Sequence, residues 1–311
     1  MPNITIITSV YYANEEFLKQ ISDTIKSQNY SGEITHIFIN DNIKKPLIIN
    51  GLNIINNKEN IALSGVWKKG FEIAKTEIIV TLMDDCLPTS NDWLVKLIEP
   101  LKQQDIAATS SKIELPKEFW EKFDFFTKAL TEKEQKIIIM PSGIDGKGCA
   151  YKKSIVESVG GFDNINFKNG GEDADLSCRL CEKWKIVSSD AKTYHFHNTN
   201  FKNRIKKEIQ YAQLAGIVSR KHFFKFSLNF KIHVIVKSFL FILLIASLRF
   251  KSLSFGLILL LIFILANFRF PFQFKRLWKN PRILLVPFLN LYIYFLYVIF
   301  FLGALIFKPE V

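Results

Sequence analysis

The sequence predicts an α/β fold, in which a mostly parallel β-sheet is flanked by helices, followed by hydrophobic helices at the C-terminus. Strand and helix patterns alternate through the first 110 residues, and long apolar runs appear only after residue 230. Strands that alternate with helices form parallel sheets with helices on both faces. We therefore expect a globular domain over residues 1–225 and a membrane anchor over residues 226–311 of this 311-residue chain.

The first half of the predicted sheet follows from four segments. Residues 4–10 form an apolar, β-branched run, which favours a strand. Residues 15–28 carry apolar side chains at helical spacing. Residues 35–41 predict a second strand, and residues 52–57 predict a short third one.

The next segments continue the alternation. Residues 64–75 predict a helix, residues 77–83 a strand and residues 91–104 a helix that Asn91 would cap. Residues 105–113 predict another strand. The strand over 77–83 runs directly into two adjacent carboxylates, Asp84 and Asp85.

Three strand ends carry polar or aromatic side chains. Tyr11 follows the first strand, Asp41 ends the second, and Asp84 and Asp85 follow the fourth. Ligands of such sheets bind beyond the carboxyl ends of the strands, and buried carboxylates are costly without a partner. These acids predict a site for Mg²⁺ or Mn²⁺ and the polar groups of a nucleotide, although solvated turn carboxylates would also explain them.

The second half of the chain is less regular. Residues 111–140 hold aromatic and charged side chains without clear periodicity, and either a lid or an insertion that faces a substrate would fit. Residues 146–163 predict a glycine-rich stretch, a strand, a short helix and a Gly-Gly turn. Glu172, Asp173 and Asp175 then open a helix, where acids suit the macrodipole but exceed what one cap requires.

Two further clusters allow more than one interpretation. Cys178 and Cys181 form a CxxC within a helical pattern, and packing on one helix face accounts for them better than zinc, because a second ligand pair is missing. His195 and His197 lie on one side of a strand-like run. Either histidine could complete the cation site, or both could be structural.

Charge and hydropathy describe a membrane-associated tail. Residues 202–282 contain 16 Lys and Arg against one acid, Glu208, whereas residues 1–201 carry about −3. Apolar runs occupy residues 239–248, 253–268 and 283–307, and the third exceeds the roughly 20 residues that cross a bilayer. We expect two or three membrane helices; buried helices of a soluble domain are the alternative. Basic clusters that alternate with such runs disfavour a nucleic-acid partner.

The distribution of basic residues predicts the topology. The basic loop over residues 269–282 is expected in the cytoplasm, and the N-terminus lacks a signal peptide. The globular part would therefore be cytoplasmic and attached to the cell membrane by a hairpin or multi-pass anchor. Residues 202–226 predict a basic amphipathic helix, whose cations could bind anionic headgroups or a lipid-linked diphosphate.

Taken together, these motifs resemble the family 2 glycosyltransferases, enzymes of the GT-A fold that use nucleotide sugars. The resemblance covers roughly residues 3–225. It rests on the opening strand, loop and helix, on the IND at 39–41, on the segment NIALSGVWKKGFEIAKTEIIVTLMDD, and on GKGCAYKKSIVESVGGFD followed by EDADLSCRL. Each motif is weak alone, whereas their order and spacing are specific.

The resemblance implies a metal-assisted, inverting transfer of one hexosyl or deoxyhexosyl unit from a nucleoside-diphosphate sugar to a lipid-linked or cell-surface glycan, as in polysaccharide biosynthesis. Its cofactor would be Mn²⁺ or Mg²⁺. Asp173 would be the catalytic base, oriented by Glu172, and burial would have to raise its pKa. The implied metal ligands are Asp85, Asp84 and His195, and the implied nucleotide-sugar contacts are Ser9, Tyr11, Asp41, Lys68 and Asp84.

Three positions depart from the family pattern. Ala62 replaces a frequent glycine, Lys68 a frequent asparagine, and Cys86 a third acid. Such losses would also suit an inactive, membrane-anchored nucleotide-binding scaffold of a glycan-assembly complex. The Gln-x-x-Arg-Trp motif of processive synthases is absent, which disfavours repeated chain extension. A nucleotidyltransferase is disfavoured because residues 11–17 contain no glycine for a phosphate loop.

Overall fold

The computed structural model describes residues 1–12, 14–132, 143–222, 276–307 and the single residues Phe239, Leu243 and Ala246. The chain divides into two compact units. The first comprises Met1–Lys122 and Lys133–Asn198, and the second comprises Phe123–Glu132 and Thr199–Val311. The expected domain boundary at residue 225 falls outside the described residues and stays a prediction.

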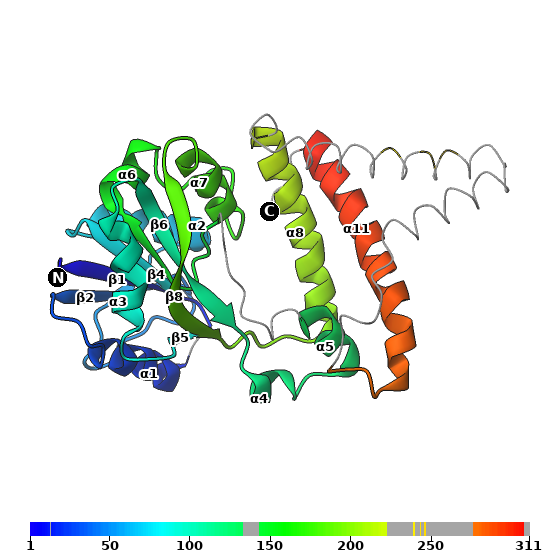
Figure 1. Cartoon of the computed structure of the whole chain (residues 1–311), viewed down its shortest axis with the longest axis horizontal. Helices are drawn as coiled ribbons and strands as arrows, with labels where there is room; N and C mark the ends of the chain where they lie inside the picture. Colours follow the sequence, from blue (N-terminus) through cyan, green and yellow to red (C-terminus); the bar gives the residue numbers. More distant parts are fainter. Residues whose placement is uncertain are drawn as a thin grey trace. The chain divides into compact units, whose positions relative to one another are not determined.

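The first unit is built on an eight-stranded mixed sheet (Figure 1). Its strands, in chain order, are β1 (Ile4–Val10), β2 (Ile34–Asn40), β3 (Ile54–Asn56), β4 (Ile78–Met83), β5 (Cys86–Pro88), β6 (Ile106–Glu114), β7 (Cys149–Lys152) and β8 (Lys185–His195). The order across the sheet is β3-β2-β1-β4-β7-β6-β8-β5. Strands β1, β2, β3 and β4 run parallel to one another, and β6 pairs in parallel with β8. Strand β7 is antiparallel to β4 and β6, and β5 is antiparallel to β8.

Helices cover both faces of this sheet. They are α1 (Glu15–Lys26), α2 (Ala62–Ile73), α3 (Trp93–Ile98), α6 (Lys153–Ser158) and α7 (Glu172–Leu180), whereas the short helix α4 (Lys117–Trp120) follows β6 and contributes to neither core. Because side chains alternate along a strand, Ile6 packs into the core with α1 and α3 while Ile7 packs into the opposite core with α2, α6 and α7. Both cores are apolar and buried, which explains why β1 reads as a continuous apolar run.

Most elements of the predicted alternation are confirmed, and two details were wrong. The helix expected over residues 91–104 ends at Ile98 and continues as a 3₁₀ turn, η1 (Glu99–Lys102), through Pro100. The expected cap, Asn91, accepts a hydrogen bond from Ser27 Oγ at 3.4 Å, whereas Asp92 occupies the N-cap position. Strand β5 was not expected, because three residues that end in proline are too few to show the alternation of apolar and polar side chains that indicates a strand.

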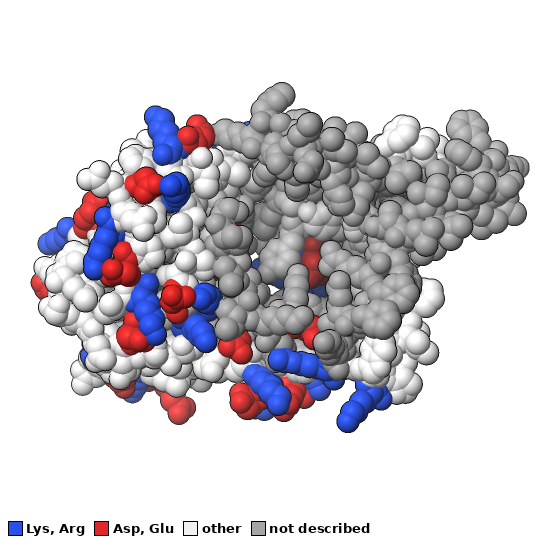
Figure 2. Space-filling model, in the orientation of Figure 1, with Lys and Arg blue, Asp and Glu red and all other residues white. Residues whose placement is uncertain are grey.

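The surface of the first unit mixes both signs of charge. In the face drawn in Figure 2, the coloured Lys and Arg side chains alternate with Asp and Glu side chains. The first unit contains exposed ion pairs such as Lys102–Glu99 and Lys185–Asp105. The described residues on this face therefore form no large patch of one sign, in agreement with the small net charge of residues 1–201.

The second unit is helical. It contains α5 (Phe125–Thr131), α8 (Phe201–His222), η5 (Pro281–Leu285) and α11 (Val286–Ile306). Helices α8 and α11 approach closely at Gly216, where a Cβ would lie 2.6 Å from the Phe301 carbonyl oxygen and 2.8 Å from the Ala304 Cβ. A side chain at this position would therefore push the two helices apart.

The C-terminal helix has the properties of a membrane span. Residues 281–306 form a continuous helical stretch of 26 residues with a mean hydropathy of 2.2, long and apolar enough to cross a bilayer. The third predicted apolar run is thus confirmed as a helix. The other two runs lie outside the described residues, apart from Phe239, Leu243 and Ala246, which are helical. The number of spans stays a prediction.

Candidate functional site

The predicted strand ends meet at one edge of the sheet. The pairings make β1, β2, β4 and β8 run in the same direction, so their carboxyl ends share this edge. Asp84 and Asp85 follow β4, Asp41 follows β2 and His195 ends β8. Ligands of α/β sheets bind at such an edge.

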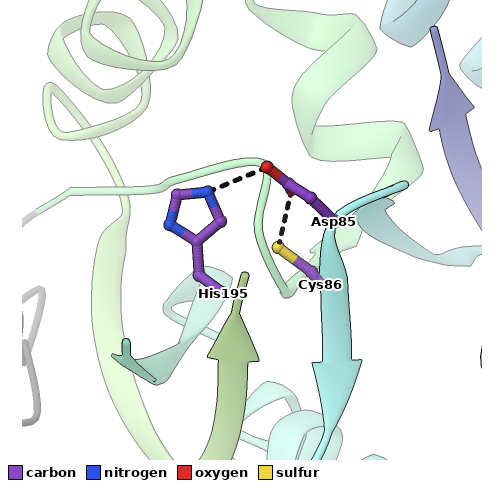
Figure 3. Close-up of side chains that lie close together, drawn as sticks. All are labelled: Asp85, Cys86 and His195. Atoms are coloured by element: carbon purple, nitrogen blue, oxygen red, sulfur yellow. Dashed lines mark hydrogen bonds and ion pairs between the residues drawn. The ribbon is translucent and has the colours of Figure 1, made fainter. Parts of the chain in front are cut away.

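Asp85, Cys86 and His195 form the most compact group of potential metal ligands among the described residues (Figure 3). Asp85 Oδ2 lies 3.1 Å from His195 Nε2, and Cys86 Sγ donates to Asp85 Oδ1 at 3.4 Å. The pairing of β5 with β8, which places Cys86 opposite His195, creates the group. Burial would raise the pKa of Asp85, but the hydrogen bond from His195 and the charges of His195 and Lys147 outweigh it and lower this pKa to about 2.

Asp85 and Cys86 differ in how accessible their side chains are to a cation. Asp85 remains about a third exposed, with 35% of its side chain accessible, whereas Cys86 is fully buried. Burial and the neighbouring Asp85 charge raise the pKa of the Cys86 thiol well above its usual value. The carboxylate of Asp85 and the imidazole of His195 are the accessible donors of the group.

Asp84 points to a different partner from its neighbour. Its Oδ2 accepts hydrogen bonds from the backbone amides of Tyr11 and Tyr12, at 2.7 and 2.8 Å. These two amides belong to the loop that follows β1, so Asp84 ties the end of β4 to the end of β1. Tyr11 and Tyr12 are left exposed, by 40% and 88%, with their rings in edge contact.

Asp41 is buried at the end of β2. Its Oδ1 accepts hydrogen bonds from Asn57 Nδ2 at 2.8 Å and from the Ile61 amide at 3.0 Å. Asn57 is itself held by Lys69, whose Nζ lies 2.6 Å from Asn57 Oδ1. Both of these hydrogen bonds go to the same carboxylate oxygen, Oδ1.

Helix α2 starts next to Asp41 with an unusual backbone conformation. Ala62 has a φ of 60° and is buried, and it is the only non-glycine with positive φ among the described residues. The left-handed region favours glycine, because a Cβ is crowded there. The departure from the family glycine at this position therefore retains the backbone shape and adds strain.

Sequence reasoning missed a second charged pair in the loop before β7. Lys147 Nζ lies 2.6 and 2.7 Å from the two carboxylate oxygens of Asp145. Asp145 is only partly exposed, but its pKa is lowered, because the charge and hydrogen bonds of Lys147 outweigh the desolvation. The only available signal was a lysine between two glycines, Gly146 and Gly148, after an apolar residue.

Gly148 explains how this loop lies so close to the sheet. Its φ is +133°, and a Cβ there would lie 2.5 Å from Ser111 Oγ and 2.8 Å from Thr193 Oγ1. The Asp145 amide also donates to Cys149 Sγ at 3.2 Å. These contacts fix the Asp145–Lys147 pair against β6 and β8.

Glu172 and Asp173 begin α7 after two glycines in left-handed or extended positive-φ conformations. Burial and the Asp173 charge raise the pKa of Glu172 to about 8, so it is mostly protonated at pH 7. Its Oε2 is buried without a hydrogen-bond partner in the described structure. Burial, together with the Asp145 charge, raises the pKa of Asp173 to about 6, the direction that a general base at neutral pH needs.

The remaining predicted site residues lie as follows. Ser9 is buried near the end of β1, Lys68 is exposed on α2, and His197 stacks on His195 with ring centroids 5.1 Å apart. Asp175 is fully buried and pairs with Arg179 at 2.7 Å. The individual functional roles of these residues stay predictions.

The charges of the site are mutually dependent. Lys147 lowers the pKa of Asp85, and it also opposes the rise in the pKa values of Glu172 and Asp173. Within this described cluster, the carboxylates outnumber Lys147, which favours a cation as an additional partner. A carboxylate–imidazole pair beside an acid with raised pKa can combine cation binding with proton abstraction.

Comparisons with known proteins agree with this geometry. A family model described as glycosyl transferase family 2 matches residues 5–160, just over half of the chain. The mannosyltransferase PcManGT from Pyrobaculum calidifontis, solved with GDP-Man and Mn²⁺, has 15% identity and a TM-score of 0.61, covering 99% of this chain and 88% of its own. A structure of GalNAc-T7 with UDP, GalNAc and Mn²⁺ has 14% identity and a TM-score of 0.49, covering 69% and 51%. No curated protein sequence matches significantly.

The mixed sheet has a GT-A-like fold. The chain belongs to glycosyl transferase family 2.

Proposed function

We propose that this glycosyltransferase transfers one hexosyl or deoxyhexosyl unit from a nucleoside-diphosphate sugar, with inversion, to a lipid-linked or membrane-proximal glycan. The observation that carries this proposal is the contact of Asp85 with His195 at 3.1 Å, in one electrostatic network with an Asp173 whose pKa is raised to about 6. The network joins a cation-binding pair to a candidate base. Family membership supports the transfer itself.

Asp85 and His195 would hold a divalent cation. Their donor atoms fit, because a low-pKa carboxylate and an imidazole lie together at an edge with excess negative charge. A cation bound there would neutralise the charge that develops on the leaving diphosphate. Imidazole is a ligand of transition metals more than of Mg²⁺, which favours Mn²⁺. The Mn²⁺ in the similar mannosyltransferase structure supports this choice.

Asp173 would take the proton of the acceptor hydroxyl. Its raised pKa makes it a stronger base than an ordinary aspartate while it is still mostly ionised at pH 7. Glu172 would remain protonated and donate a hydrogen bond from its carboxyl group. This assigns the two adjacent acids different tasks, base and donor, because their pKa values differ.

The nucleotide would lie over the ends of β1 and β2. Asp41 Oδ2 would accept a hydrogen bond from the base, and the exposed Tyr11 and Tyr12 rings offer a stacking surface. Ser9 and Lys68 remain candidate contacts. Asp84 would act by shaping the β1 loop through its two amide contacts, with the ribose or a cation-bound water as its further partner.

The proposed acceptor, a lipid-linked glycan, is inferred from the expected attachment of the enzyme to the membrane. The C-terminal helix is apolar enough to span a bilayer, and the basic residues between 202 and 282 would place the catalytic domain, residues 1–225, on the cytoplasmic side of the cell membrane. Anchoring residues 226–311 as a hairpin or multi-pass segment would keep the enzyme close to lipid-linked glycans.

The test is nucleoside-diphosphate release by the detergent-solubilised full chain. UDP-, GDP- and dTDP-sugars would be screened with Mn²⁺ or Mg²⁺, with lipid-linked glycan as acceptor. We expect metal-dependent release from one donor, and its loss in Asp173→Asn and in Asp85→Asn. The matched control is Asp190→Asn, which removes an exposed carboxylate paired with Lys112.

The outcomes separate the enzyme from an inactive scaffold. Near-wild-type release by Asp173→Asn would refute the base assignment. Metal-dependent nucleotide binding without release from any donor, across the acceptor panel, would support the membrane-anchored nucleotide-binding scaffold instead.

A further inference from the structure

The second unit contains a cavity of about 530 Å³ beside the start of the C-terminal helix. It is formed by the first half of α5 and by the segment that leads into η5. Its lining residues are Phe125, Lys128, Arg276, Leu277, Lys279, Asn280, Pro281 and Arg282. The cavity lies entirely within the second unit, and the reaction described above uses none of its residues.

The charged side chains described around the cavity are all positive. Four of the eight described lining residues are basic, and none of these eight is acidic. Lys128 comes from α5, whereas the other three cations come from a span of seven residues, Arg276 to Arg282. Like charges gathered around one cavity repel one another, and an anion between them relieves that repulsion.

The backbone holds these cations in place. Asn280 Oδ1 accepts a hydrogen bond from the Arg282 amide at 3.0 Å and caps the first turn of η5. The Asn280 amide donates to the Leu277 carbonyl at 3.0 Å, and the Ile283 amide donates to the Asn280 carbonyl at 2.9 Å. A fixed turn reduces the entropy that would be lost when Lys279 and Arg282 close on a ligand.

Exposed apolar side chains begin next to these cations. Leu284 is 71% exposed and Phe288 is 69% exposed, directly after Arg282 along the chain. Trp278, between two of the basic residues, is 50% exposed. Tryptophan and basic residues at the end of an apolar helix mark the boundary between a bilayer and water. The cavity therefore lies beside residues of the kind found where a helix enters the headgroup layer.

We propose that this cavity binds the phosphate head of an anionic membrane lipid, with the acyl or prenyl chain lying along the exposed apolar residues of α11. The cations match the phosphate oxygens, and Phe125, Leu277 and Pro281 match the first apolar groups that follow the head. A phospholipid and a phosphorylated isoprenoid carrier share this chemistry. The proposal does not depend on sugar transfer.

The test measures lipid binding to the detergent-solubilised full chain by calorimetric titration. The probes are dihexanoyl phosphatidate, farnesyl phosphate, dihexanoyl phosphatidylcholine and inorganic phosphate. We expect both anionic lipids to bind, and Lys279→Gln/Arg282→Gln to weaken them roughly tenfold or more, because each basic group near a lipid surface contributes to binding. The anionic lipid that binds with the higher affinity shows whether the natural ligand is a phospholipid or a phosphorylated isoprenoid.

The control is Lys102→Gln/Lys185→Gln, which removes two exposed cations from the first unit. Equal weakening in both double variants would mean nonspecific attraction and would overturn the proposal. Equal binding of phosphatidylcholine, or displacement of phosphatidate by inorganic phosphate at the same concentration, would also overturn it. Unchanged thermal unfolding of the cavity variant excludes misfolding as the cause of a loss.

Discussion

Asp85 and His195 are 110 residues apart in the sequence, and their side chains meet at 3.1 Å. The contact arises because β5 leaves the edge of β4 and pairs antiparallel with the end of β8. The Phe196 amide also donates to the Asp85 carbonyl at 2.8 Å, so the backbone itself fixes this approach. Two segments that are distant in the sequence thereby supply one group of potential metal ligands.

Replacing His195 should weaken cation binding, whereas replacing His197 should not. His195 is in contact with Asp85, while His197 stacks on the outer side of the imidazole ring. We expect His195→Ala to reduce Mn²⁺ affinity at least tenfold, in line with other losses around metal sites. Free Mn²⁺ measured by electron paramagnetic resonance gives the affinity. Unchanged affinity in both variants would eliminate histidine as a ligand.

The rate of sugar transfer should rise with pH through about 6. The pKa of Asp173 is raised to about 6, and a base must be ionised, so activity is lost as pH falls through that value. We expect Asp173→Asn to lower kcat by roughly 10²- to 10⁴-fold and to remove this limb of the profile. The measurement is kcat against pH from 5 to 8. An acidic limb that persists in the variant would assign it to another group.

Glu172 should make stability decrease as the pH rises. Its folded pKa of about 8 exceeds the ordinary value of 4.5, so between these values the folded state holds a proton that the unfolded state has lost. Stability therefore falls with rising pH across this window. The lowered pKa of Asp85 acts only below about pH 4.

The variant Glu172→Gln isolates this effect. Because the amide does not ionise, the difference in Tm between variant and wild type should increase from pH 5 to pH 8. Subtracting the two curves removes contributions from the other acids. A difference that stays constant with pH would contradict the burial of a protonated Glu172.

Ala62→Gly should stabilise the protein. Ala62 has a φ of 60°, which costs about 1–2 kcal/mol for a residue with a Cβ, and the greater entropy of glycine in the unfolded chain offsets part of the gain. We expect a net gain of about 0.5–1 kcal/mol in the free energy of unfolding. The control Ala74→Gly, at a φ of −66°, should not stabilise. A Tm increase of equal size in both variants would argue against relieved strain.

Gly216→Ala should loosen α8 from α11, because its Cβ would lie 2.6 Å from a backbone oxygen that cannot rotate away. Overpacking of this kind costs about 1–3 kcal/mol. Gly303→Ala is the matched control, since no atom lies within 4 Å of a Cβ there. It should be neutral or slightly stabilising, as expected for alanine in a helix. Protease accessibility of the C-terminal helix would report the difference, and similar behaviour of the two variants would refute the close packing.

Much of the fold could be predicted because its signals are local. The β-branched run at β1 and the helical spacing in α1 depend on neighbouring residues only. Strand β5 and the shortened α3 were not predicted, because a three-residue pairing is stabilised by β8, and Pro100 tightens the last turn. Local propensity carries no information about such distant partners.

The site could be predicted in part. The sequence predicted that four acids lie at the ends of strands or at the start of a helix: Asp41, Asp84, Asp85 and Asp173. It did not predict that Asp84 and Asp85 have different hydrogen-bond partners. Asp84 is directed to the amides of the β1 loop and Asp85 to His195. The partner of each carboxylate depends on the direction of its side chain, and the side chains of the adjacent Asp84 and Asp85 point in different directions.

By itself, the sequence determined the alternation of strands and helices, the carboxylates at the strand ends and the apolar C-terminal helix. These features depend on hydrophobic periodicity and turn residues, which act over a few positions. Only the tertiary structure joined Asp85 to His195, added Asp145 and Lys147, and buried Glu172 and Asp173 enough to raise their pKa values. Desolvation and Coulomb energies depend on all neighbouring atoms in space, so they are decided only when distant segments pack together.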